Sequence, residues 1–195
     1  MSSTNRSGEG RIALDAYYTP DALAAACVSL VPFSGEGLVL EPSVGGGAFA
    51  RAVRARWPST FVVGADVHPE APGRSDVHHF EAVDVLSWRP FPPPNLIVGN
   101  PPYTDAEAHV QWALDTVAQG GTVGMLLRLA FLETKKRRAF WARWGSYLDT
   151  VYVLAERPSF LANGKHDSCA YGWFVWRKAT GCASRVVPAW SGRSV

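Results

Sequence analysis

Short apolar runs alternate along the chain with segments in which apolar side chains recur every three or four positions. The runs predict buried strands, and the periodic segments predict helices with one apolar face. Strands are expected at residues 37–41, 61–65, 77–85, 95–99 and 121–129. Helices are expected at residues 21–31, 48–57, 106–118 and 133–144. Strands that alternate with helices are typical of an α/β fold around a mostly parallel sheet.

The last two apolar runs break this alternation. Residues 148–155 and 169–176 both predict strands, and the segment between them has no helical pattern. Two strands without an intervening crossover helix are typically antiparallel. We therefore expect an antiparallel hairpin near the C-terminal end of the sheet.

Size and composition indicate one domain. The chain has 195 residues, 47% of them hydrophobic and 18% charged, which is enough to bury a core without disulfides or metals. No apolar run approaches the ~18 residues of a membrane helix, and the N-terminus lacks the apolar core of a secretory signal. The three cysteines form no CxxC pair, which indicates a reduced, cytoplasmic protein. We expect a loose tail over residues 1–10, a domain over residues 11–180 and a second tail over residues 181–195.

Charge is unevenly distributed although the net charge is only +2. Residues 1–127 hold 7 Lys and Arg against 13 Asp and Glu, whereas residues 128–178 hold 10 against 4. A basic second half can hold phosphates, although a solvated surface without a ligand has the same pattern. The candidate phosphate-binding side chains are Arg128, Lys135, Lys136, Arg137, Arg138 and Lys165.

A glycine-rich turn separates the first predicted strand from the next helix. Gly45, Gly46 and Gly47 allow the backbone to turn sharply and to approach a ligand closely. The spacing differs from a dinucleotide fingerprint, and no lysine follows as in a P-loop, so pyrophosphate is a weak candidate. Glu41, at the mouth of the turn, would repel a phosphate and attract a cation. A tight loop without a ligand is the alternative interpretation.

Two further acids follow predicted strands at the same edge of the sheet. Asp66 closes the second strand, where an acid can hold ribose hydroxyls. Asp84 follows the third strand and can bind an adenine amine, although an aspartate at this place is often only a turn residue. A nucleoside with a positive charge and no phosphate fits these features. S-adenosylmethionine (SAM) is such a ligand.

A stiff loop with hydrogen-bond acceptors follows the fourth predicted strand. Its residues are Asn100, Pro101, Pro102 and Tyr103. Consecutive prolines remove two amide donors, which leaves the Asn100 side-chain oxygen beside the Pro101 carbonyl. Two adjacent acceptors suit a planar NH2 group, and the Tyr103 ring can stack on a flat substrate.

This acceptor pair suits methylation of a delocalised nitrogen. Such a nitrogen is a poor nucleophile because its lone pair belongs to a π system. Two accepted hydrogen bonds strengthen as positive charge develops, so they stabilise the transition state more than the ground state. A sulfonium methyl donor has a neutral leaving group, and no histidine or cysteine spacing in the chain matches a zinc site, so we expect no metal.

Together these motifs resemble the SAM-dependent N6-adenine DNA methyltransferases of the amino-methyltransferase group. The resemblance covers most of residues 15–176 and is carried by LEPSVGGGAF, by NPPY and by their order. It implies the Rossmann-like class I methyltransferase fold, with a mostly parallel seven-stranded sheet and one antiparallel strand. It also implies transfer of a methyl group from SAM to the N6 amine of a flipped or single-stranded adenine in DNA, with S-adenosylhomocysteine as product.

The resemblance also implies roles for single residues. The segment before the first helix would close over the methionine part of SAM, and Phe160 would pack on the flipped base that Tyr103 contacts. The cofactor-binding positions would be Tyr17, Thr19, Pro20, Glu41, Pro42, Ser43, Gly45, Gly47, Phe49, Asp66, Val67, Asp84, Val85 and Asn100. The catalytic motif would be Asn100 to Tyr103.

The catalytic domain nearly fills the chain and leaves no space for a sizeable target-recognition domain. We therefore expect low or short sequence specificity, or DNA contacts supplied by a homodimer or a specificity subunit. Small methyltransferases of bacteriophages and mobile elements are similar in size. N5-glutamine methylation of a protein, methylation of an RNA base, and a nucleotide- or DNA-binding module without catalysis remain as alternatives.

Overall fold

A computed structural model describes residues 18–133, 135–158, 160, 169–179 and 184–189. The strands are β1 (Leu38–Glu41), β2 (Phe61–Asp66), β3 (His79–Ala82), β4 (Leu96–Gly99), β5 (Thr122–Arg128), β6 (Leu148–Leu154), β7 (Tyr171–Arg177) and β8 (Arg185–Ala189). The α-helices are α1 (Asp21–Ser29), α2 (Ala48–Arg56), α3 (Ala106–Thr116) and α4 (Arg138–Trp144). Short 3-10 helices are η1 (Pro72–Asp76), η2 (Val85–Ser87), η3 (Leu129–Phe131), η4 (Lys135–Arg137) and η5 (Gly145–Tyr147).

All the described strands form one sheet in the order β3-β2-β1-β4-β5-β7-β6-β8. β7 is antiparallel to its neighbours β5 and β6, and the other pairs are parallel. The predicted α/β class, the mostly parallel sheet and the late antiparallel pair are therefore confirmed. The sheet has eight strands where seven were expected, because β8 pairs with β6 inside the segment expected to be a tail.

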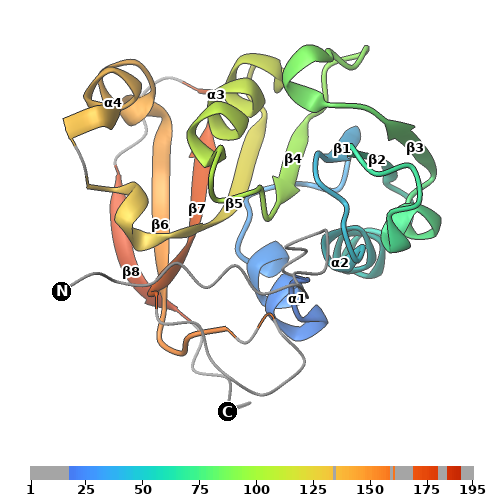
Figure 1. Ribbon diagram of the computed structural model, residues 1–195, viewed down its shortest axis with the longest axis horizontal. Helices are drawn as coiled ribbons and strands as arrows, with labels where there is room; N and C mark the ends of the chain where they lie inside the picture. Colours follow the sequence, from blue (N-terminus) through green and yellow to red (C-terminus); the bar gives the residue numbers. More distant parts are fainter. Residues whose placement is uncertain (1–17, 134, 159, 161–168, 180–183, 190–195) are drawn as a thin grey trace, which may run out of the picture.

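Helices cover both faces of the sheet (Figure 1). On one face, α1 and α2 bury Leu23 and Phe49 in a cluster that includes Val39 of β1. On the other face, α3 and α4 build a second cluster that includes Trp112 and Leu40. Because successive side chains of a strand point to opposite faces, neighbouring residues of β1 enter different clusters. The result is a three-layer arrangement with two cores.

Two elements are shorter than their sequence patterns predict. The strand expected at residues 77–85 is limited to β3, because the Asp84 side chain accepts a hydrogen bond from Leu86 N at 3.0 Å and turns the chain into η2. The helix expected at residues 133–144 becomes α-helical only at α4. Before it, the Arg137 guanidinium donates to the carbonyl oxygens of Ala130 (2.9 Å) and Glu133 (3.1 Å) and holds a tighter turn.

The chain reverses its direction of travel across the sheet between β1 and β4. β1 pairs with β2 on one side and with β4 on the other, and ligands of open α/β sheets bind beyond the carboxyl ends of the strands at such a point. The fold brings Glu41, Asp66 and Asn100 to this edge. In the described part of the chain, none of the helices has the length and apolar character needed to cross a bilayer.

Candidate active site

A cavity of about 710 Å³ lies at the carboxyl ends of β1, β2 and β4. Cavities of roughly 300–1,000 Å³ commonly hold cofactors and other small molecules. Most residues with predicted cofactor or catalytic roles are in its wall. They are Thr19, Glu41, Pro42, Ser43, Gly45, Phe49, Asp66, Val67, Asp84, Val85, Asn100, Pro101, Pro102 and Tyr103.

Some predicted cofactor residues support this wall from behind. Pro20 is the N-cap of α1 and Gly47 is the N-cap of α2. Phe49 reaches the wall, but its side chain is 1% exposed and stacks on Trp173 with ring centroids 5.4 Å apart, so it belongs mainly to the core. Tyr17 and Lys165 lie outside the described residues.

The glycine turn is held in one conformation by backbone hydrogen bonds. Gly45 and Gly47 have φ angles of 48° and 78°, in the region that glycine adopts without steric cost. Gly47 N donates to Val44 O at 2.7 Å, and the Gly45 carbonyl accepts from Gly73 N at 2.9 Å. The turn is therefore a shaped wall of the cavity, tied to η1 on its outer side.

Asp66 connects this turn to the end of β2. Its Oδ2 atom accepts from Gly45 N at 2.9 Å, and its Oδ1 atom accepts from His68 N at 3.0 Å. Each carboxylate oxygen can accept more than one hydrogen bond, so these contacts orient the group and leave capacity for hydroxyl donors. Asp84 is exposed and bonds to Leu86 N, which is the turn role that its position after a strand also allowed.

Glu41 is a buried part of the wall and does not stand at an open mouth, as the sequence had suggested. Its side chain is 2% exposed, and Oε2 accepts from Ala50 N of α2 at 2.8 Å. Burial raises the pKa of Glu41 well above its usual 4.5, although the Ala50 amide and the Arg51 charge oppose this rise. The expected attraction of a cation is weakened to the extent that this acid stays protonated.

We expect the Glu41→Gln variant to resist thermal unfolding better than the wild type at alkaline pH. A carboxyl group whose pKa is raised by folding stabilises the protein fully below its unfolded value of 4.5, and this stability is lost as the pH rises through the folded-state pKa. Glutamine keeps an acceptor for Ala50 N but does not ionise. Thermal unfolding from about pH 5 to pH 9 should show that the melting temperature of the variant, relative to that of the wild type, increases with pH. A melting-temperature difference that stays constant across this range contradicts a raised pKa of Glu41 in the folded protein.

Asn100 lies directly after β4 and lines the cavity. Its Nδ2 atom donates to Thr19 Oγ1 at 3.2 Å, across 81 positions of the sequence. This hydrogen bond distinguishes the two ends of the amide, because the oxygen must then lie on the side away from Thr19. Thr19 makes this contact from the segment just before α1, so the two motifs form one wall.

Tyr103 is surrounded by aromatic and basic groups. Its ring centroid is 5.5 Å from that of Tyr171 and 6.3 Å from that of Phe160. The Arg128 guanidinium lies 4.8 Å from the Tyr103 centroid, and Arg128 also lines the cavity. Burial, reinforced by the Tyr171 hydroxyl, raises the pKa of Tyr103, so its hydroxyl stays neutral at physiological pH.

The sandwich of a base between Tyr103 and Phe160 is not formed in this conformation, and the base contact of Phe160 stays a prediction. Phe160 is 7% exposed and packs on Tyr171 with centroids 5.2 Å apart. Rings within about 7 Å are in direct contact, which leaves no gap for a base between Tyr103 and Phe160. Phe160 is a core residue that supports Tyr103, and Arg128 is the described residue that joins Tyr103 in the wall.

The four basic residues at positions 135–138, the basic block, have different surroundings. Lys135, Lys136 and Arg138 are exposed, as a phosphate-binding role requires. Arg137 instead donates to main-chain carbonyls and lies 3.4 Å from Glu107, near the start of α3. In this conformation Arg137 is engaged within the protein, and its role as a phosphate ligand stays a prediction. The Glu107 contact also places the block beside the helix that follows the Asn100 loop.

Two features of the site were missed in the sequence. His109 of α3 lines the cavity although it is 8% exposed, and residues 69–72 complete the wall after β2. His109 follows an ordinary helical pattern, so the sequence carried no signal for it. The Tyr18 ring, in the segment expected to close over SAM, covers the glycine turn, since a Cβ atom on Gly46 would lie 3.0 Å from it. Among the described residues, no cluster of three or more His, Cys, Asp or Glu can hold a metal ion.

No family model and no curated protein matches the sequence. Solved structures share the fold. A Listeria monocytogenes protein assigned to the class I SAM-dependent methyltransferases has 12% identity and a TM-score of 0.67, with 90% of this chain and 68% of that chain covered. The methyltransferase subunit of a Streptococcus thermophilus type I restriction-modification system has 15% identity and a TM-score of 0.65, with 83% and 44% covered. A Pyrococcus horikoshii protein assigned as an RNA methyltransferase has 14% identity and a TM-score of 0.64, with 84% and 87% covered.

These similarities establish the fold. The chain has the class I methyltransferase fold, with the cavity at the carboxyl ends of the adjacent central strands β1 and β4. It spans less than half the length of the restriction-modification subunit. Identities of this size carry no information on substrate, which has to be inferred from the cavity itself.

Proposed function

We propose that this protein transfers the methyl group of SAM to the exocyclic N6 amine of adenine in DNA. The observation that carries the proposal is Asn100, held by Thr19 in the wall of a cavity that also contains the glycine turn and Asp66. This combination supports the proposal because an amide acceptor and a wall suited to a nucleoside line the same cavity. A binding module without catalysis has no need of that acceptor.

The cavity residues fit SAM. Asp66 ends β2 with carboxylate oxygens that can accept hydrogen bonds from ribose hydroxyls. Gly45 and Gly46 have no side chains, and a Cβ atom on either would contact the Tyr18 ring, so these glycines keep the space beside Tyr18 open. Tyr18 and Val67 add apolar surface at the rim, since they are 44% and 59% exposed. When bound, SAM supplies an electrophilic methyl carbon on a sulfonium with a neutral thioether leaving group.

The chain's own residues prepare the attacking nitrogen. Asn100 accepts one N–H of the amine, and the Pro101 carbonyl is the second acceptor that the motif offers. The nitrogen forms a bond to the methyl carbon as the sulfur–carbon bond breaks, and one N–H proton then leaves to solvent. Both acceptors act mainly by stabilising the charge that develops on nitrogen. Positioning the amine in line with the methyl group supplies the rest.

Nucleic acid is favoured over protein as substrate by the surroundings of Tyr103. The Arg128 guanidinium beside the Tyr103 ring suits a nucleotide, which offers a flat base and a phosphate. A glutamine side chain offers neither. The exposed Lys135, Lys136 and Arg138 add cations beside the start of α3. DNA is preferred to RNA because of the resemblance of the NPPY motif to adenine DNA methyltransferases.

One labelling experiment separates these candidates. The protein is incubated with methyl-labelled SAM and, in parallel, with duplex DNA, single-stranded DNA, RNA and a release-factor protein. The products are then digested to nucleosides or amino acids and identified. N6-methyladenine from DNA is the expected product. Methylglutamine or a methylated RNA base replaces the proposal with an alternative, and SAM binding without transfer to any substrate supports the binding module.

We expect the basic block to determine the salt dependence of DNA binding. Replacing Lys135, Lys136 and Arg138 together by Glu should weaken binding and reduce the slope of log affinity against log salt by about 0.9 for each phosphate that is no longer neutralised. Affinities measured by fluorescence anisotropy at several salt concentrations test this. Arg56→Glu, an exposed charge at the end of α2, is the control. Equal slopes for the triple variant and the wild type mean that the block is only solvated surface.

A further inference from the structure

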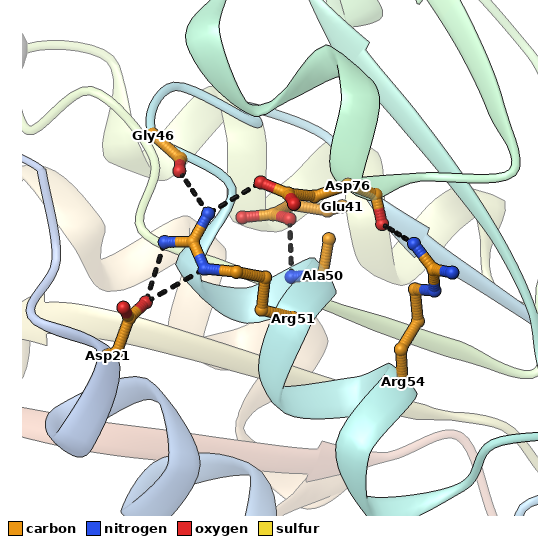
Figure 2. Close-up of polar contacts among 7 residues, drawn as sticks. All are labelled: Asp21, Glu41, Gly46, Ala50, Arg51, Arg54 and Asp76. Carbon is orange, nitrogen blue, oxygen red and sulfur yellow. Dashed lines mark hydrogen bonds and ion pairs between the residues drawn. The ribbon is translucent and has the colours of Figure 1, made fainter.

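Arg51 of α2 joins three segments that build one side of the cavity (Figure 2). Its Nε and Nη2 atoms donate to Asp21 Oδ1 at 3.1 and 2.6 Å. Its Nη1 atom donates to Asp76 Oδ2 at 2.5 Å and to the Gly46 carbonyl oxygen at 2.7 Å. One guanidinium thus connects the first residue of α1, the end of η1 and the glycine turn. Arg51 is not one of the described residues that line the cavity.

The glycine turn needs such an external partner. Gly45, Gly46 and Gly47 have no side chains to restrict their backbone, so contacts from outside must select one conformation. The Gly45 carbonyl is held by Gly73 N at 2.9 Å, and the Gly46 carbonyl by Arg51. Both oxygens are thereby directed to partners outside the turn. Without Arg51, the Gly46 peptide is left without the side chain that orients it.

The same guanidinium reaches the segment that contacts Asn100. Asp21 follows Thr19 by two residues, and Thr19 Oγ1 accepts from Asn100 Nδ2 at 3.2 Å. Arg51 therefore holds one end of residues 18–21, and Asn100 contacts the middle of this segment. The Tyr18 ring, at the other end, covers the glycine turn itself. This layout connects the turn to the catalytic loop through one short stretch of chain.

We propose that Arg51 is a positioning residue that couples the glycine turn to residues 18–21, so that SAM affinity and the alignment of Asn100 depend on a single guanidinium. The inference depends on the proposed function in one respect, which is that SAM binds against this turn. An arginine is required because its planar fork serves carboxylates and a carbonyl in fixed directions, whereas a lysine ammonium is a point charge.

The role is one of geometry more than of stability. The side chains of Arg51, Asp21 and Asp76 are 42%, 69% and 26% exposed. Ion pairs in such solvated positions contribute little to folding free energy. Loss of Arg51 should therefore change the melting temperature by only a few degrees, while it changes ligand binding more strongly. This contrast separates a positioning role from a purely structural one.

The test uses Arg51→Met and Arg51→Lys, with Arg54→Met as the matched control. Arg54 lies on the same helix and also contacts Asp76, but through the main-chain oxygen at 2.9 Å (Figure 2). Isothermal titration gives the SAM dissociation constant, single-turnover assays give the transfer rate, and hydrogen exchange follows the amides of residues 45–47. We expect both Arg51 variants to weaken SAM binding about tenfold, and Arg54→Met to behave like the wild type.

Asp21→Ala separates the two halves of the coupling. This variant removes the Oδ1 acceptor of Arg51 but keeps the contacts of Arg51 with Gly46 and Asp76. SAM affinity should therefore change less than about twofold, while the transfer rate falls several-fold because residues 18–21 lose their anchor. If Arg51→Lys restores SAM affinity fully, charge and not geometry is what matters, and the proposal is overturned. It is also overturned if Arg54→Met weakens SAM binding as much as Arg51→Met does.

Hydrogen exchange tests the positioning role of Arg51 separately from the proposed methyl transfer. If the wild type binds no SAM, the proposed function fails. Faster exchange at residues 45–47 in Arg51→Met than in Arg54→Met would even then show that Arg51 holds the turn. If the wild type does bind SAM but exchange at residues 45–47 is the same in all variants, the positioning role fails and the proposed function stands.

Discussion

Replacing Asn100 by alanine should slow methyl transfer by about a hundred- to a thousandfold while the SAM dissociation constant stays nearly unchanged. The side chain is at the end of β4, and its proposed partner is the substrate amine, not the cofactor. An acceptor whose hydrogen bond strengthens as charge develops affects the rate of the chemical step more than binding. Single-turnover rates with labelled SAM, set beside calorimetric titration of SAM, measure the two quantities separately.

Thr19→Val is a second variant that should slow methyl transfer less than Asn100→Ala does. Valine matches threonine in shape but removes the Oγ1 atom that accepts from Asn100 Nδ2 at 3.2 Å. The Asn100 oxygen stays in the site but the amide loses its hydrogen bond to Thr19, so a loss of about tenfold in rate is expected, equivalent to one ordinary hydrogen bond. Full activity of Asn100→Ala would remove this residue from the mechanism. A Thr19→Val defect confined to SAM binding would mean that Thr19 serves the cofactor alone.

Gly47→Ala should destabilise the protein by about 2–4 kcal/mol and weaken SAM binding with it. Gly47 has a φ angle of 78°, which L-residues rarely adopt. A Cβ atom there would also overlap the Asp76 carboxylate and lie 2.8 Å from Gly73 Cα, a backbone atom that cannot move away easily. Urea unfolding followed by circular dichroism measures the loss of stability.

Gly120→Ala is the matched control for this substitution. Gly120 has nearly the same φ angle, 80°, but no described atom lies within 4 Å of an added Cβ. Only the backbone strain remains, so the loss should be about 1–2 kcal/mol, with SAM affinity unchanged. If both variants lose the same stability, the close approach of η1 to the glycine turn has no energetic consequence, and the turn is less tightly packed than the structure indicates.

Local pattern was enough to predict the fold class and the edge of the sheet at which the site lies. The apolar runs and helical periods along residues 37–144 predict the alternation of β1 to β5 with helices. In a parallel sheet the strand ends point the same way, so acids and NPPY at those ends had to meet at one edge. β8 was missed because its apolar signal is limited to Val186 and Val187, too short to stand out from a tail.

The sequence by itself determined the α/β class, the glycine turn and the strand-end positions of Glu41, Asp66 and Asn100, because each depends on residues close together in the chain. Only the tertiary structure decided which side chains meet: Thr19 with Asn100, Arg128 with Tyr103, and Phe160 with Tyr171. The tertiary structure also decided that Arg137 donates to main-chain carbonyls and that Glu41 is buried against α2. Such pairings depend on how distant segments pack, and a charge or a ring has the same local signature whether it faces a ligand or the core.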